Sequence, residues 1–163
     1  MLYFAYGSNM ALARLQQRIP SARRLGTGHL PGYQLRFHVA STKDGSAKCD
    51  AFLTGDDNDL VVGALFRLDP EAKPVLDGYE GVGVEYRDEL VSVEFGGGRQ
   101  EALIYVGSNL DSALRPFNWY REHVLRGALE NDLPVEYVAA IREVPCVDDP
   151  DAERTLRELS IYR

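Results

Sequence analysis

No hydrophobic run in this chain approaches the roughly 18 apolar residues that a membrane-spanning helix needs. The N-terminus also lacks a basic stretch followed by a long apolar stretch, so we expect neither a secretory signal nor a membrane anchor. Positive charge is scarce as well, because 18 Lys and Arg stand against 25 Asp and Glu and leave a formal net charge of −7. Proteins that bind nucleic acid usually present a basic stripe. The charge balance therefore predicts no nucleic-acid partner.

Cysteine and histidine are too few and too scattered to predict a metal site. The two cysteines, Cys49 and Cys146, lie far apart and form no CxxC motif. The three histidines, His29, His38 and His123, fall in three different predicted elements. We expect both cysteines to be reduced thiols of a cytoplasmic protein, with a disulfide or a catalytic thiol as the alternative. The sequence therefore predicts no metal site.

The length of 163 residues suits one domain spanning residues 1–163, and no repeat or linker interrupts it. Strands alternate irregularly with a few helices, which favours an α+β fold over a regular βαβ alternation. Strands are expected over residues 2–6, 26–39 with a turn at 31–32, 49–54, 60–68, 86–95 and 101–106, the last two as a hairpin. Helices are expected over residues 12–19 (with Asn9 as N-cap), 70–78, 116–129 and from 134 onward, with a weak helix in the acidic tail after 148.

The first candidate site is the end of the first strand. Leu2–Tyr6 runs directly into Gly7-Ser8-Asn9, and a helical pattern follows. At such a turn backbone N–H groups lack partners and the helix dipole adds positive potential, so the turn predicts an anion site. Ser8 is a weak candidate nucleophile, because no Gly-x-Ser-x-Gly elbow surrounds it, and a hydroxyl that caps the turn is the better interpretation.

The second candidate is Glu80, which lies between Gly78 and Gly81 after the short helix predicted over residues 70–78. Desolvation among apolar groups raises the pKa of a carboxyl and makes it a useful base near neutral pH. Neighbouring Asp77, Glu85 and Asp88 would act in the same direction by like-charge repulsion. The alternative interpretation is a solvated glutamate in a loop between helix and strand.

Three stretches of the chain resemble motifs of the gamma-glutamylcyclotransferase family. Phe4-Ala5-Tyr6-Gly7-Ser8-Asn9-Met10 is similar to its N-terminal motif, and residues 76–82 (LDGYEGV) are similar to the segment that carries its essential glutamate. Residues 120–137 resemble its C-terminal helix-turn-helix. The stretches occur in the order found in the family, and together they are more specific than any one of them.

The resemblance implies a small mixed β-barrel flanked by helices and a reaction without metal or cofactor. In that reaction the substrate's α-amine attacks its own γ-carbonyl, which releases 5-oxoproline and an amine or amino acid. The resemblance also implies an acyltransferase or lyase of glutathione metabolism. It assigns proton transfer to Glu80 and substrate binding to Tyr3, Phe4, Ala5, Tyr6, Gly7, Ser8 and Tyr137, with Tyr86 as a weaker candidate.

Two departures from the family pattern lie beside Glu80 and bear on which substrate is used. Position 79 is Tyr, where relatives that act on gamma-glutamyl dipeptides often have a polar residue. The spacing from Glu80 to Tyr86 is one residue shorter than in the animal enzymes. A non-catalytic binding or interaction domain on the same fold, and a hydrolase that uses Ser8, are the competing functions. The tail after Asp148 would cover either the mouth of the site or an interface in a homodimer.

Overall fold

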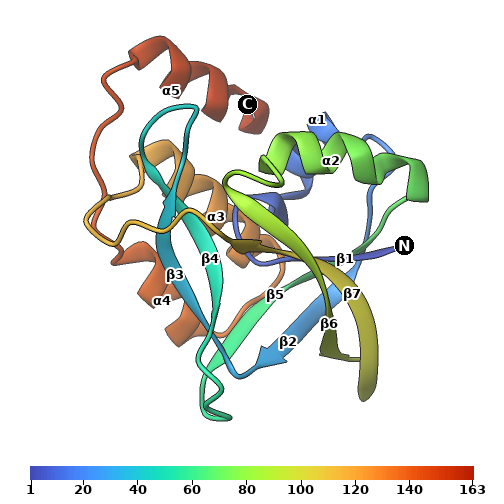
Figure 1. Cartoon of the computed structure of the whole chain (residues 1–163). Helices are drawn as coiled ribbons and strands as arrows, with labels where there is room; N and C mark the ends of the chain where they lie inside the picture. Colours follow the sequence, from blue (N-terminus) through green and yellow to red (C-terminus); the bar gives the residue numbers. More distant parts are fainter.

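Five strands close into a barrel in the computed structural model, which describes all residues 1–163. The strands follow one another around the barrel in the order β1-β5-β2-β6-β7 (Figure 1). Their bounds are β1 Leu2–Ala5, β2 Arg23–Pro31, β5 Leu60–Arg67, β6 Tyr86–Phe95 and β7 Gly98–Gly107. Four of the pairings are antiparallel, and the barrel closes where β1 meets β7 in parallel at Tyr3 and Leu103. The expectation of a mixed barrel in an α+β fold is confirmed.

Small residues let the barrel close around the ring of Phe4. A Cβ atom at Gly63 would lie 2.4 Å from the backbone oxygen of Ala5 and 2.9 Å from that ring, so only glycine fits there. Phe4 and Ala5 are therefore core residues of the barrel, each at most 1% exposed. This packing fixes the end of β1, from which the Gly7 turn departs.

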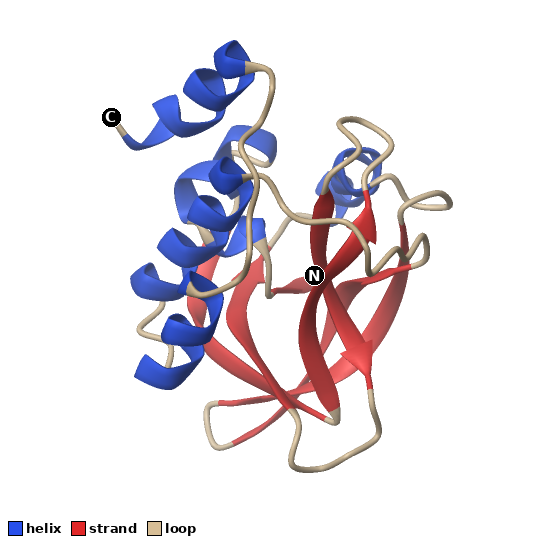
Figure 2. Cartoon of the chain, turned by 90° about the vertical axis from the view of Figure 1, so that its left-hand side faces the viewer, coloured by secondary structure: helices blue, strands red, loops and turns tan.

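A separate two-stranded sheet and a set of helices complete the fold (Figure 2). The two strands are β3 Tyr33–Ala40 and β4 Ala47–Leu53. The helices are α1 Leu12–Arg18, α2 Lys73–Glu80, α3 Asn118–Glu130, α4 Val135–Arg142 and α5 Ala152–Leu159, with 3-10 turns η1 Ser8–Met10, η2 Pro70–Ala72 and η3 Ser160–Tyr162. None of these helices combines the length and the apolar character needed to cross a membrane.

Most predicted elements are confirmed within two or three residues, and the β6–β7 hairpin is among them. Two details were wrong. Asn9 does not cap α1, because its side chain points to Tyr3 and Glu80 and the N-cap position belongs to Ala11. Glu80 does not lie in a loop, because α2 extends to it and ends at Gly81, whose φ of 62° allows the left-handed cap.

Candidate functional site

The turn after β1 presents an unpaired backbone donor, as the sequence predicts. The N–H of Gly7 donates to no carbonyl or side chain. A Cβ at this position would lie 3.0 Å from the Cβ of Cys49, so glycine lets the turn pack closely on β4. Helix α3 supports the turn from the other side, since a Cβ at Gly127 would lie 2.5 Å from the Cβ of Met10.

Glu80 reaches this turn from the end of α2. The Nδ2 atom of Asn9 donates to Oε1 of Glu80 at 2.9 Å, and Nη1 of Arg18 lies 3.4 Å from the same oxygen. The Asn9 amide also donates to the Tyr3 hydroxyl at 3.1 Å, so it orients both groups. No contact of this kind engages Oε2, and the side chain is 15% exposed. The carboxylate is thus fixed through one oxygen and has the other free.

Burial raises the pKa of Glu80 above its ordinary value of 4.5, against the opposing effects of Arg18, Arg14, Lys43 and Asn9. Like-charge repulsion from the neighbouring acids is not among the main causes of the rise, which corrects the expectation. Both Asp77 and Asp88 face Lys73 at 2.8 Å. Glu85 accepts from the backbone N–H and hydroxyl of Thr42 at 2.6 and 2.7 Å. Desolvation is therefore the cause of the raised pKa.

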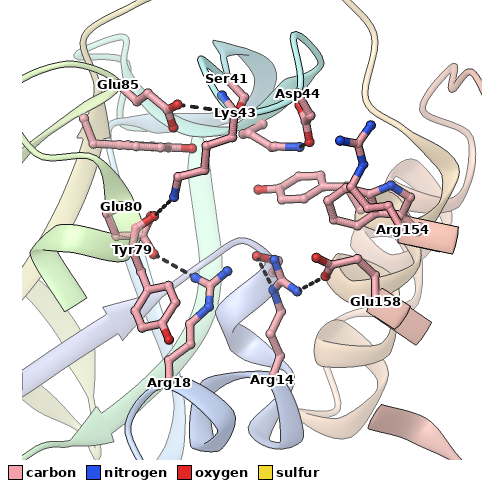
Figure 3. Close-up of a pocket in the computed structure, with 15 residues that line it drawn as sticks. Arg14, Arg18, Ser41, Lys43, Asp44, Tyr79, Glu80, Glu85, Arg154 and Glu158 are labelled. Atoms are coloured by element: carbon pink, nitrogen blue, oxygen red, sulfur yellow. Dashed lines mark hydrogen bonds and ion pairs between the residues drawn. The ribbon is translucent and has the colours of Figure 1, made fainter. Parts of the chain in front are cut away.

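Two adjoining cavities meet at Glu80. The inner one is a recess of about 30 Å³. It is lined by Tyr3, Tyr6, Gly7, Ser8, Asn9, Cys49, Glu80, Tyr86, Tyr105 and Tyr120. The outer cavity, drawn in Figure 3, is about 300 Å³. Ser8, Glu80, Tyr86 and Tyr120 line both cavities. A ligand can therefore reach from the recess past the carboxylate into the larger space.

The wall of the inner recess is uncharged apart from Glu80. Burial raises the pKa of Tyr6, Tyr86 and Tyr120 well above 10, so these hydroxyls stay protonated at pH 7. Their hydrogen bonds fix them: Tyr6 donates to the carbonyl of Tyr105, Tyr86 donates to the Cys49 carbonyl at 2.6 Å, and Tyr120 accepts from the Cys49 N–H. Burial also raises the pKa of Cys49, so its thiol is not poised as a nucleophile.

Charged side chains from several elements line the outer cavity, and sequence reasoning missed most of them. The cations are Arg14, Arg18, Lys43, Lys48 and Arg154, and the acids are Asp44, Glu80, Glu85 and Glu158. In Figure 3, Arg14 and Arg18 rise from α1 while Lys43 reaches across from the loop between β3 and β4. Lys43 donates to the Tyr79 carbonyl at 2.7 Å and has no carboxylate partner. No local motif marks these residues, because they come from segments far apart in the chain.

The predicted site residues fall into two groups. Tyr3, Tyr6, Gly7, Ser8 and Glu80 meet at the inner recess, and the weaker candidate Tyr86 lines both cavities. Phe4 and Ala5 line neither cavity, because both are buried in the core, at 0% and 1% exposed.

Tyr137 does not join the others. It lies on α4, and its hydroxyl accepts from the backbone N–H of Val62 at 3.2 Å, beside a different surface groove. A buried tyrosine hydroxyl requires a hydrogen-bond partner, and here the barrel strand β5 supplies it.

Other chemistry finds little support in the geometry. The Ser8 hydroxyl lies 3.2 Å from the Nε of Arg14, which donates to it and cannot act as a base. No group of three or more His, Cys, Asp or Glu side chains is arranged to hold a metal ion.

The Tyr79 side chain packs against Arg18, whose guanidinium lies 4.9 Å from the centre of the Tyr79 ring.

Comparison with known proteins agrees with the fold and identifies the family. Residues 60–141 match the AIG2-like family. The gamma-glutamylcyclotransferases of mouse and human are 31% and 29% identical to this chain over 147 residues, which is 88% of the chain and 78% of each relative. A solved structure of a gamma-glutamyl cyclotransferase superposes with a TM-score of 0.85 at 26% identity, over 99% of this chain and 98% of the other. The chain therefore belongs to the AIG2-like family, as a relative of the gamma-glutamylcyclotransferases, and the resemblance of its motifs is confirmed.

Proposed function

We propose that this protein is a gamma-glutamylcyclotransferase that releases 5-oxoproline from a gamma-glutamyl amide. The observation that carries the proposal is Glu80, a desolvated carboxylate with one free oxygen at the junction of two cavities. The unpaired Gly7 N–H lies at the same recess. Together they offer a base and an oxyanion or carboxylate donor to one small ligand.

The glutamyl half of the substrate suits the junction of the two cavities, with its α-carboxylate or its developing oxyanion facing Gly7 at the inner recess. The amine half then extends into the outer cavity. Attack by the substrate's own amine makes the reaction intramolecular, so a site that selects the folded conformer gains several powers of ten in rate. Removal of a single oxyanion donor typically costs about 3–4 kcal/mol, so the turn matters whichever oxygen it holds.

Glu80 moves the proton in both halves of the reaction. The α-amine nitrogen forms a bond to the γ-carbonyl carbon, and its proton passes to the carboxylate. The C–N bond of the amide then breaks as Glu80 returns that proton to the leaving nitrogen. The products are 5-oxoproline and a free amine or amino acid, and the enzyme ends in its starting protonation state.

The two competing functions have less support. A binding domain does not account for the similarity to the gamma-glutamylcyclotransferases, which are enzymes, and hydrolysis by Ser8 lacks a base. The assignment to the acyltransferases or lyases, a role in glutathione metabolism and a cytoplasmic location belong to the same proposal. Two free cysteines, one of them fully buried, are compatible with a reducing compartment.

The first test measures 5-oxoproline release from a panel of gamma-glutamyl amino acids and amines. Glu80→Gln keeps the shape of the side chain but cannot accept the proton, so we expect a loss of about 10²–10⁴-fold or more in kcat. The matched control is Glu71→Gln, which should retain activity. Glu71 is exposed, has no side-chain partner, and lies in η2, directly before α2. Turnover by Glu80→Gln within threefold of the parent, or release of free glutamate, would contradict the proposal.

The pH profile gives a second prediction. Glu80 must be ionised to accept a proton, so kcat/KM should rise with pH through a pKa above the ordinary 4.5 of a glutamate. Arg18→Met removes the principal charge that lowers this pKa, and the rise should then move to higher pH. An unchanged or lower midpoint in Arg18→Met would show that the limb belongs to another group.

A further inference from the structure

The C-terminal segment, residues 152–162, packs on the site without a core of its own. Neither α5 nor η3 contains a buried residue. The match to the AIG2-like family ends at residue 141, so it gives this segment no role. Figure 1 shows α5 on the same side of the molecule as the loop between β3 and β4, and both Arg154 and Glu158 line the outer cavity.

A chain of polar contacts leads from this segment to the turn after β1. Oε2 of Glu158 lies 2.5 Å from Nη1 of Arg14. The Nε of Arg14 donates to the Ser8 hydroxyl at 3.2 Å, and its Nη1 also contacts Nε2 of His123 at 2.9 Å. The other ring nitrogen of His123 lies 2.6 Å from the hydroxyl of Tyr162. Residues from both ends of the chain thus converge on one guanidinium.

The protonation of this cluster follows from its burial and its ion pair. Nε2 of His123 lies 2.9 Å from Nη1 of Arg14 and 3.1 Å from Oε2 of Glu158, and Nδ1 lies 2.6 Å from the Tyr162 hydroxyl. Burial lowers the pKa of His123 to about 4, so the ring is neutral at pH 7. Burial acts to raise the pKa of Glu158, but its contacts with His123 and Arg14 outweigh it and lower this pKa to about 2. Glu158 is therefore the anion that balances Arg14.

We propose that Glu158 is a positioning residue for the cyclotransferase site. Glu158 holds Arg14 against Ser8, and this contact fixes the turn that carries the Gly7 N–H. Arg14 is only 9% exposed, and Glu158 is its one carboxylate partner. A buried cation that loses its counter-ion is strongly destabilised and moves toward another partner. For Arg14 that movement breaks its contact with Ser8. The inference rests on the proposed function, because its main readout is 5-oxoproline release.

The test compares Glu158→Gln with Glu153→Gln, an exposed position of α5 without a partner. Displacement of a reacting geometry by about 1 Å can cost 10²-fold in rate. We expect Glu158→Gln to reduce kcat/KM by ten- to hundredfold while circular dichroism shows the parent fold, and Glu153→Gln to match the parent. The loss should be equal for every amine in the panel, because the turn holds the glutamyl half. A loss that differs between amines would assign Glu158 to direct contact with the leaving group and overturn the positioning role.

A double-mutant cycle shows whether Glu158 acts through Arg14. If it does, Arg14→Gln with Glu158→Gln is no less active than the more impaired single variant, because residues of one network are not additive. Multiplication of the two losses would overturn the inference.

Hydrogen exchange of the peptide around Gly7 and Ser8 keeps this inference separate from the proposed function. Faster exchange in Glu158→Gln than in Glu153→Gln supports positioning even if no substrate in the panel turns over, which would count against the proposed function alone. Equal exchange, or full activity of Glu158→Gln beside an inactive Glu80→Gln, overturns the inference and leaves the function standing.

Discussion

Glu80 and Glu85 line the same cavity, but their environments differ because their hydrogen-bond partners differ. Glu85 is 4% exposed, and one of its oxygens accepts from the Thr42 N–H, the Thr42 hydroxyl and, at 3.4 Å, the Ser41 hydroxyl. It therefore anchors the loop between β3 and β4. Glu80 has one short hydrogen bond, from Asn9 to Oε1, and its Oε2 has no partner.

This contrast predicts opposite effects of the same substitution. Glu85→Gln loses charge-assisted hydrogen bonds and should lower the free energy of unfolding by about 2 kcal/mol. Glu80→Gln removes a desolvated charge and should leave the free energy of unfolding unchanged or slightly higher, while activity is lost. Urea unfolding of both variants measures this, with Glu89→Gln as a control because its pair with Arg87 is exposed. Equal stability of Glu85→Gln and the parent would show that the loop does not depend on this carboxylate.

At the scale of elements, the close approach of α3 to η1 positions the Gly7 turn. Gly127 makes it possible, because a Cβ there would lie 2.6 Å from the N of Ala11 as well as 2.5 Å from the Cβ of Met10. Asn131 at the end of α3 adds a hydrogen bond from its Nδ2 to the Met10 carbonyl at 3.1 Å. The sequence predicts α3 and the turn at Gly7-Ser8-Asn9 but not that they meet.

Gly127→Ala should therefore destabilise the protein although alanine favours helices. Overpacking costs about 1–3 kcal/mol, which exceeds the gain of up to about 1 kcal/mol in helix propensity. The matched control is Gly78→Ala in α2, where a Cβ meets nothing within 4 Å and propensity alone should raise the free energy of unfolding. Urea unfolding curves decide the sign at each position. Stabilisation by Gly127→Ala would mean that the contact between α3 and η1 is loose.

At the scale of the whole molecule, one buried cluster joins α1, α3 and the C-terminal segment. His123 is fully buried and neutral, with a pKa of about 4 against 6.5 for the ordinary side chain. Between these values the unfolded chain binds more protons than the folded one, so the free energy of unfolding falls as the pH falls from about 6.5 to 4.

We expect this fall to amount to about 3 kcal/mol, since each pKa unit corresponds to about 1.4 kcal/mol. The contribution of Glu158 should be lost in a lower window, from 4.5 down to about 2. Denaturant unfolding at several pH values between 7 and 4 measures the first step, and His123→Gln should remove it. A parent protein equally stable at pH 7 and pH 4 would contradict the assigned protonation of His123.

The sequence by itself determined the local features of this protein. Alternating apolar residues predict β6, the three glycines at 96–98 predict the reversal into β7, and Pro20 predicts the end of α1. The Gly7 turn and the position of Glu80 were also readable, because their motifs are contiguous. These features depend on backbone geometry and on neighbours within a few residues.

Only the tertiary structure decided how these pieces form a site. Asn9 and Glu80 are 71 residues apart, and Arg14 and Glu158 are 144 apart, so no local pattern pairs them. The direction of the Glu80 pKa shift depended on burial, whereas the nearby acids suggested by the sequence turned to other partners. Packing between distant segments also places Tyr137 against β5, away from both cavities, and places Arg154 and Glu158 of α5 at the outer cavity. Electrostatic interactions and desolvation depend on distances in space, and the order of residues in the sequence does not show which surfaces the fold brings together.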